Sequence, residues 1–203
     1  TYNGTSLFCE LLSNYTRAQD RQLVRILKIK ETTCETINLG NLPFIVTTLG
    51  EKITSITEIG KFICSLTGTF DVLFGRTNID IERHVTFIND FNTASDKLEF
   101  LNKVLMYNSF CNGYHVTISD IYAFANVLVL LQHIQDKDKF TYSNLFRWAI
   151  HVQSMKGIQE QVSRLKLLIY APTDKLFIEI KKEKNEKHEK TDKNEKKAID
   201  INV

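Results

Sequence analysis

The sequence predicts a protein of mixed α+β but mostly α class, in which a small α/β unit precedes an all-helical unit. The 203 residues include only 2 Pro and 8 Gly, a composition typical of long helices with few turns. Apolar residues repeat at helical spacing from about residue 71 to residue 170. Short β-branched runs that suit strands fall within the first 54 residues.

Residues 1–70 are expected to form the mixed unit. Four apolar residues at positions i, i+3, i+4 and i+7 indicate an amphipathic helix: Phe8, Leu11, Leu12 and Tyr15. Three short runs are predicted strands: residues 23–29 (LVRILKI), 43–47 (PFIVT) and 52–54 (KIT). A second helix follows at Ile56, Ile59, Ile63 and Leu66. Gly68 is its expected end, because glycine tolerates the left-handed backbone found after helices.

Residues 71–180 are expected to form the all-helical unit. Five apolar stripes mark its helices: Ile81, Val85, Ile88 and Phe91; Leu98, Leu101 and Leu105; Ile121, Phe124, Leu128 and Leu131; Leu145, Trp148, Val152 and Met155; Ile158, Val162, Leu165 and Ile169. The third helix is apolar nearly all round, which predicts burial on most sides. Thr117 and Asp120 have the spacing of a capping box at its start. Ala171 and Pro172 are expected to end the last helix.

Residues 181–203 differ in composition and are expected to form a disordered linker. The stretch 181–197 (KKEKNEKHEKTDKNEKK) holds 8 Lys against 4 Glu and 1 Asp, a charge of +3. Since the whole chain carries +2 and Asp200 adds one negative charge, residues 1–180 are neutral. A neutral folded part argues against a nucleic-acid surface there. The linker is either a plain spacer or a tether for tRNA.

Several kinds of site are missing from the sequence. It contains no phosphate-binding glycine loop, no dinucleotide-binding pattern and no H-E-x-x-H zinc pattern. The four cysteines show no C-x-x-C spacing: Cys9, Cys34, Cys64 and Cys111. We therefore expect no metal and no cofactor, and we interpret the cysteines as reduced core residues of a cytoplasmic protein. The five histidines are expected on the surface or hydrogen-bonded in the core. No apolar run reaches the ~18 residues of a membrane span.

Two segments in the second half resemble a known family. Residues 109–124 (SFCNGYHVTISDIYAF) combine a glycine turn with a capped helix, and residues 142–153 (YSNLFRWAIHVQ) form a helix with an Arg-Trp pair. Together they resemble the helical half of a glutathione-transferase-like (GST-like) domain. The Arg-Trp helix is similar to that of the domains appended to aminoacyl-tRNA synthetases and their accessory proteins. Residues 71–75 (DVLFG) and 81–85 (IERHV) resemble the amino-terminal domain of glutamyl-tRNA synthetases.

The resemblance implies that residues 1–70 form a degenerate thioredoxin-like half, with a cis bond before Pro43. Glutathione-binding members carry an acidic residue or Gln followed by Ser where this chain has Ser55 and Ile56. Isoleucine has no hydroxyl, so that contact to glutathione is lost. Matches to the family's catalytic residue exist by position only: Tyr2, Ser6 and Cys9. The resemblance therefore implies a domain that holds an assembly together and performs no chemistry.

The sequence offers two candidate interfaces: the Arg-Trp helix, and the face around residues 56–66 of the expected thioredoxin-like half. We expect Trp148 to anchor the core, which places Arg147, His151 and Ser154 on the exposed face. The resemblance implies that this helix pairs with its counterpart in a partner domain, where the matching arginine stacks on and binds groups across the interface. Arginine suits this role because its planar guanidinium stacks and binds carboxylates.

Asp136 and Asp138, in the preceding loop, are the candidate reciprocal acceptors for an interface arginine. The alternative is that Arg147 is solvated or pairs within its own domain, with Asp120 or a loop aspartate. Structural roles are expected for Pro43, Thr117, Asp120 and Trp148.

Three functions remain open at this point. The first is a scaffold module that docks on GST-like domains of other synthetases or accessory proteins, or forms a homodimer. It would contact tRNA only indirectly or through the Lys-rich tail. Its favoured form is the N-terminal part of glutamyl-tRNA synthetase, with glutamate–tRNA ligase activity located beyond Val203. The second is a glutathione transferase with an altered thiol site. The third is a tRNA-binding accessory protein of the complex.

Overall fold

The computed structural model describes residues 4–19, 45–46, 50, 52–136 and 138–169. All of them belong to one structural unit, Thr1–Ile169. Several predictions lie outside the described residues: the strand at 23–29, the cis bond before Pro43, the positions of Tyr2 and Cys34, and the linker 181–203.

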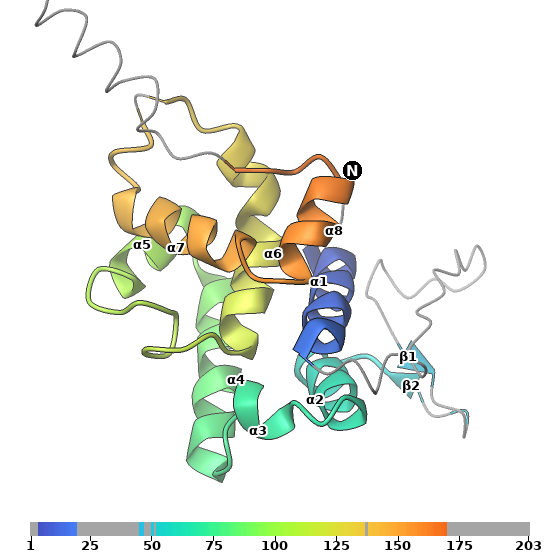
Figure 1. Cartoon of the computed structure of the whole chain (residues 1–203). Coiled ribbons are helices and arrows are strands. Elements are labelled where there is room, and N and C mark those ends of the chain that lie inside the picture. The colour runs from blue at the N-terminus through green and yellow to red at the C-terminus, as the bar shows by residue number, and fades with distance from the viewer. Residues whose placement is uncertain (1–3, 20–44, 47–49, 51, 137, 170–203) are drawn as a thin grey trace, which may run out of the picture. The chain divides into compact units, whose positions relative to one another are not determined.

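Within the described part the chain is mostly helical (Figure 1). The helices are α1 (Gly4–Gln19), α2 (Ile56–Leu66), α3 (Phe70–Leu73), α4 (Asn78–Thr93), α5 (Lys97–Val104), α6 (Ile118–Gln132), α7 (Ser143–Gln153) and α8 (Ile158–Arg164). Strands β1 (Ile45–Val46) and β2 (Lys52–Ile53) pair antiparallel, with Ile45 opposite Ile53. The mostly helical class is confirmed. The thioredoxin-like character of the first half stays a prediction.

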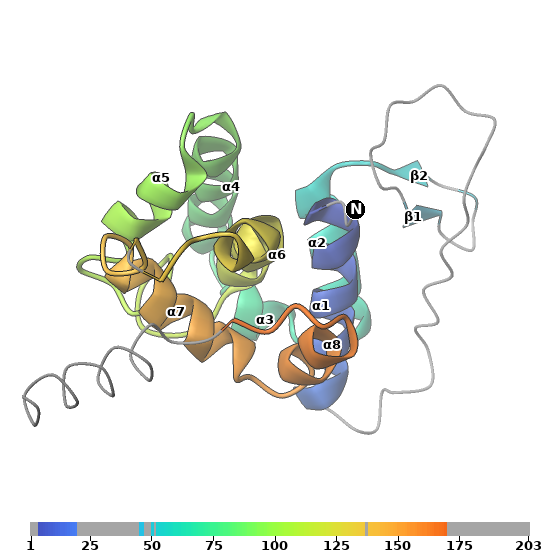
Figure 2. The ribbon, with the colours of Figure 1, turned by 90° about the horizontal axis from the view of Figure 1, so that it is seen from above.

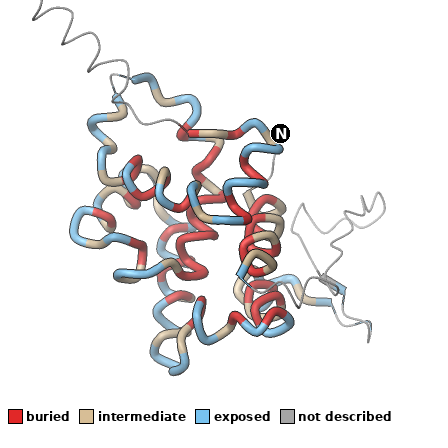
Figure 3. Tube along the Cα trace, viewed as in Figure 1, coloured by how far each residue is buried: buried red, intermediate tan, exposed pale blue. Residues whose placement is uncertain are grey.

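Helix α6 is the centre of the bundle. Figure 2 shows it between α1 on one side and α4, α5 and α7 on the other. All four residues of its predicted stripe are buried: Ile121, Phe124, Leu128 and Leu131. Figure 3 shows buried residues along much of α6 and on the helices around it. The prediction that this helix is buried on most sides is confirmed.

Helix α1 packs along α6, with α2 and α8 also in contact with it. The predicted stripe of Phe8, Leu11, Leu12 and Tyr15 is buried. At the start of α8, Gly157 adopts a left-handed backbone with φ +85°, and a Cβ there would collide with the backbone of Asn14 on α1. Only glycine combines that dihedral with so close an approach. Helix α1, which precedes residue 70, thus packs against α6 and α8, which follow it. The predicted division into two subdomains at residue 70 stays a prediction.

The other stripes are confirmed with adjustments. Leu101 and Leu105 are buried, as are Leu145, Trp148 and Val152. In α4, however, the buried face contains His84 and Phe87 beside Ile88 and Phe91, whereas Ile81 and Val85 are half-buried. Among the described residues, no helix combines the length and the hydropathy that a membrane-spanning helix requires.

The last predicted helix is wrong in its length. Helix α8 ends at Arg164, and Lys166 follows with a left-handed φ of 58°. Leu167 and Ile169 are buried in the segment after the helix, where the Gln153 side chain bonds both backbone groups of Ile169, at 3.0 and 2.6 Å. The helix therefore ends before Ala171 and Pro172. An extended segment that packs on a core also buries some of its side chains at intervals. The apolar spacing therefore could not show where helix α8 ends.

Candidate interaction surface

Helix α6 begins at the predicted capping box, which the structure confirms. The Asp120 Oδ2 atom accepts hydrogen bonds from the Thr117 amide at 2.9 Å and from the Thr117 hydroxyl at 2.8 Å. Its Oδ1 atom accepts from the Cys111 amide and from the Trp148 indole, both at 2.8 Å. Asp120 is fully buried. Burial raises the pKa of its carboxyl, while its hydrogen bonds act in the opposite direction.

Asp120 therefore joins three parts of the bundle: the start of α6, the preceding loop and α7. We call residues 105–117 the α5–α6 loop. Trp148 is 1% exposed and packs edge-on against Phe124, at 6.1 Å between ring centroids. Its predicted role as core anchor agrees with this position, and its indole bond to Asp120 is an addition that the sequence pattern did not show.

A second buried cluster holds the α5–α6 loop from inside. The His84 Nδ1 atom lies 2.8 Å from Asn112 Nδ2 and 3.0 Å from Ser119 Oγ, and Asn112 Nδ2 also donates to Ser119 Oγ at 2.9 Å. Burial lowers the pKa of His84 to about 4. The neutral ring can accept at Nδ1 from the Asn112 amide, which a protonated Nδ1 cannot do. His84 is thus a hydrogen-bonded core histidine, one of the two settings expected for the histidines.

Arg147 holds the same loop from the outside. It lies on the exposed face of α7, whereas the next residue, Trp148, is buried. Its Nη2 atom donates to the Leu105 carbonyl at 2.8 Å and to the Asn108 carbonyl at 3.0 Å. Its partners within the described residues are therefore backbone carbonyls, and not Asp120 or a loop aspartate.

The other candidate interface residues are exposed, but not all are free. The Ser154 hydroxyl donates to the His151 carbonyl at 2.7 Å, and the His151 ring packs edge-on with Phe110, at 5.2 Å between centroids. Asp136 forms an ion pair with Lys139 at 2.6 Å. Asp138 is exposed. The interface role of these residues stays a prediction.

Three exposed residues of the α5–α6 loop were missed by the sequence analysis. Tyr107 and Tyr114 are each 85% exposed, and Met106 is 51% exposed. The signal that could have found them is a run rich in large apolar residues that contains no Lys, Arg, Asp or Glu from residue 105 to residue 117.

The thiols of the described cysteines are poor nucleophiles. Burial raises the pKa of Cys9 to about 11 and that of Cys64 to about 12, and it also raises the pKa of the fully buried Cys111. A thiolate is the reactive form, so these shifts disfavour thiol chemistry. Cys64 and Cys111 are buried free cysteines, as expected, whereas Cys9 is half-buried.

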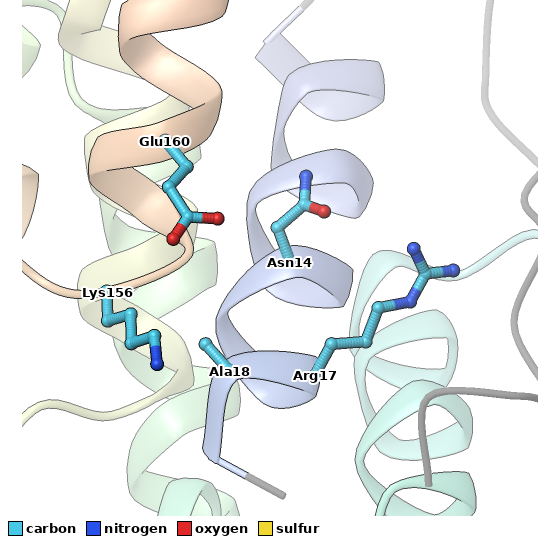
Figure 4. A pocket seen from close by; sticks show the side chains of 5 residues that line it. All are labelled: Asn14, Arg17, Ala18, Lys156 and Glu160. Atoms are coloured by element: carbon cyan, nitrogen blue, oxygen red, sulfur yellow. The ribbon is translucent and has the colours of Figure 1, made fainter. Parts of the chain in front are cut away.

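A surface cleft lies between the end of α1 and the start of α8 (Figure 4). Its lining residues are Asn14, Arg17, Ala18, Lys156 and Glu160. Figure 4 shows the Arg17 side chain pointing away from Lys156 and Glu160. Arg17 therefore does not face the same point as Lys156 and Glu160. The described residues also contain no group of His, Cys, Asp and Glu that could hold a metal ion.

Comparison with known proteins points to the same half of the chain. Residues 81–156 match an Arc1p-like family described as the nuclear-export cofactor Arc1p. This match runs from α4 to the turn after α7 and contains the α5–α6 loop. The chain is also similar to human eukaryotic translation elongation factor 1 epsilon-1, with 24% identity over 132 residues, which cover 60% of this chain and 75% of the relative. Neither of these two is a glutamyl-tRNA synthetase.

Proposed function

We propose that this chain is a non-catalytic interaction module with an accessory role in an aminoacyl-tRNA synthetase complex. The observation that carries the proposal is the overlap between the family match at 81–156 and the α5–α6 loop held by Arg147 of α7. The human relative is named as a translation elongation factor, which places that protein in translation. The resemblance of residues 109–124 and 142–153 to synthetase-appended domains points to the same setting.

Two observations support a function without chemistry. Burial makes Cys9, the described thiol nearest the family's catalytic position, a weak nucleophile. Ile56, which stands where glutathione-binding members carry serine, is a half-buried residue at the start of α2. A glutathione transferase would need a different thiol site. Turnover of a generic electrophile with glutathione, or retention on a glutathione matrix, would support that second function and contradict ours.

The proposed interface is the exposed face of α7, with Arg147, His151 and Ser154. Asp138 is the better placed reciprocal acceptor, because Asp136 is already paired with Lys139. The proposed partners are GST-like domains of other synthetases or accessory proteins, and a homodimer is the expected substitute when the partner is missing. We place this function in the cytoplasm, with tRNA contacted indirectly or through the Lys-rich tail.

A finer form of the proposal makes the chain the amino-terminal part of glutamyl-tRNA synthetase. It rests on residues 71–75 and 81–85, which in the structure lie in α3 with its following turn and in the first half of α4. Cloning the transcript beyond Val203 tests it. A continuing reading frame with class I synthetase nucleotide-binding motifs supports this form, and a different downstream domain or a stop codon contradicts it.

The test of the function is affinity capture from a lysate of the source cell, with mass spectrometry of the bound proteins. The baits are the wild-type chain, Arg147→Ala and the control Arg76→Ala, which removes an exposed arginine paired with Asp71 on another part of the surface. We expect synthetases or their accessory proteins with wild type and with the control, and at least one of them to be lost with Arg147→Ala. Recovery of none with wild type would contradict the proposed function.

Direct tRNA binding has its own measurement, because the third function predicts it. Binding of tRNA by a chain shortened to residues 1–180 is expected to be weak at all salt concentrations, since that part is neutral. A steep decrease of tight binding with added salt would contradict this expectation.

A further inference from the structure

The α5–α6 loop presents apolar side chains that contribute little to the fold. Tyr107 and Tyr114 are the two most exposed large hydrophobic side chains among the described residues, and Met106 lies next to Tyr107. Aromatic and methionine side chains are enriched at protein–protein interfaces, where burial on a partner removes their apolar surface from water.

These side chains stand on a base that is fixed at both ends. On either side of Tyr107, the carbonyls of Leu105 and Asn108 accept from Arg147, and the Asn108 side-chain Nδ2 donates to the Val104 carbonyl at 3.1 Å. Before Tyr114, Phe110 and Gly113 bond each other's backbone at 3.0 and 3.3 Å.

The buried side chains of Asp120 and His84 hold the residues between these two ends, through the Cys111 amide and the Asn112 side chain. A loop fixed in this way loses little further conformational entropy on binding. The exposed side chains are therefore preorganised for a contact.

The α5–α6 loop and helix α7 carry a positive but no negative side chain. Residues 105–117 and helix α7 contain no Asp or Glu. They contain Arg147 and the exposed histidines His115 and His151. Both bonds of Arg147 use Nη2, so within the described residues its Nε and Nη1 donors make no hydrogen bond. A carboxylate from outside would satisfy them with a charge-assisted hydrogen bond.

We infer that the α5–α6 loop is the main contact of the proposed interface and that it binds an acidic, apolar protein surface. Met106, Tyr107 and Tyr114 contact aliphatic or aromatic side chains of the partner. Arg147 positions the loop through Nη2 and receives a partner carboxylate at Nε or Nη1. This inference rests on the proposed function. It differs in the role of Arg147, which now positions the α5–α6 loop in addition to contacting the partner.

A protein fits this surface better than a nucleic acid. Residues 104–136 contain no Lys or Arg, and Arg147 is the one permanent cation in the loop and α7 together. Binding of single strands combines aromatic stacking with a charged groove that follows the phosphates, and one arginine does not supply that groove.

The test uses displayed peptides and does not depend on knowing the partner. A random 12-residue peptide library is selected on the full chain, and the affinities of enriched peptides are measured by fluorescence anisotropy. We expect enriched peptides to carry Asp or Glu beside apolar residues. Tyr107→Ser is expected to weaken binding at least tenfold, and Ile79→Ala, which shortens a 67% exposed apolar residue on α4, is the matched control.

Two further measurements separate the roles of the residues. Replacing the peptide's acidic residue by its amide is expected to weaken binding to wild type several-fold, but to have little effect with Arg147→Ala. Amide hydrogen exchange of residues 106–109 is expected to accelerate in Arg147→Ala and to stay unchanged in Ile79→Ala.

Enriched peptides without acidic residues, or equal affinity for wild type and Tyr107→Ser, would overturn the inference. Tight binding of an oligo(U) probe that competes with the peptides would overturn it in favour of a nucleic acid. Capture of synthetases that is insensitive to Tyr107→Ser would overturn the inference and leave the proposed function standing. Selection of acidic peptides together with failure of the capture experiment would contradict the function alone.

Discussion

The chain uses the same four-residue motif at the start of two helices, with very different consequences. Thr77 and Asp80 form a capping box on α4, and Thr117 and Asp120 form one on α6. At α4 the carboxylate accepts hydrogen bonds from Thr77 and pairs with Arg83 of the same helix at 3.9 Å, and the Thr77 bonds are the main cause that lowers the pKa of Asp80. At α6 the carboxylate is fully buried, and its second oxygen holds Cys111 and Trp148.

The difference shows that the same helix-capping motif can act only on its own helix or can also hold distant segments together. Both boxes satisfy amides at a helix start, which is the local function of the motif. Only the box at α6 also connects two other segments, and one of these is the α5–α6 loop. Four experiments test or refine this comparison, and they are given in order of decreasing expected effect.

Asp120→Ala is expected to produce the largest loss of stability. It removes four hydrogen bonds and leaves the buried Trp148 indole and the Cys111 amide without partners. We expect the free energy of unfolding to decrease by about 3 kcal/mol or more, measured by urea denaturation with circular dichroism. Asp120→Asn, which keeps the shape and one acceptor, should lose less. A decrease below about 1 kcal/mol for Asp120→Ala would show that Asp120 is only a local cap.

His84 is expected to make the stability of the chain sensitive to acid. Its pKa is about 4 in the folded protein, below the ordinary value of 6.5. The unfolded chain therefore binds the proton more readily, so the contribution is complete above pH 6.5 and is lost as the pH falls toward 4. The loss is of order 3 kcal/mol at most.

Urea denaturation between pH 7 and pH 4 measures the effect of His84. The control is His84→Asn, which cannot titrate, and the difference between the two chains should shrink through this window. The charged neighbours are Asp80 and Arg83 on α4 and His115 in the loop, and they are the same in both chains. A difference in unfolding free energy that stays constant from pH 7 to pH 4 would contradict the conclusion that His84 is buried in its neutral form.

Trp148→Phe separates the indole hydrogen bond from the volume of the ring. The variant keeps an aromatic ring beside Phe124 but removes the donor to Asp120 and leaves a smaller side chain. We expect a loss of about 2 kcal/mol in the free energy of unfolding. Combined with Asp120→Ala, the second change should cost much less than it does alone, because the two residues share one bond. Additive losses would show that they act independently.

Asp80→Ala is the matched change at the surface box and should have the smallest effect. Its partners are Thr77 and Arg83, both exposed residues on or beside the same helix, so its removal leaves no buried group without a partner. The midpoint of urea denaturation should shift by a small fraction of the shift seen with Asp120→Ala. Equal shifts would mean that both boxes act only on their own helices.

Much of the helical arrangement was predictable from the sequence, because apolar periodicity records burial directly. The stripes of α1, α6 and α7 and the capping box at Thr117 are examples. The box at Thr77 has the same spacing, but the sequence analysis did not identify it. The end of α8 was also missed, since Leu167 and Ile169 are buried in non-helical chain.

The candidate site was less predictable, for physical reasons. The exposure of Arg147 followed from its place outside the apolar stripe of α7, but its partners are the carbonyls of Leu105 and Asn108. Every residue has a carbonyl, so no side-chain pattern marks these partners. The exposure of Tyr107 likewise depends on how the loop is held, and aromatic residues elsewhere in this chain, such as Phe124, are core.

The loop fixed by Asp120, His84 and Arg147 is, as we infer above, the contact surface of this module. Its most direct test is quantitative capture from the source-cell lysate with wild type, Tyr107→Ser and Ile79→Ala. We expect Tyr107→Ser to retain the fold and to capture at least tenfold less synthetase or accessory protein than wild type, while Ile79→Ala captures as much as wild type. Equal capture by all three chains would contradict it.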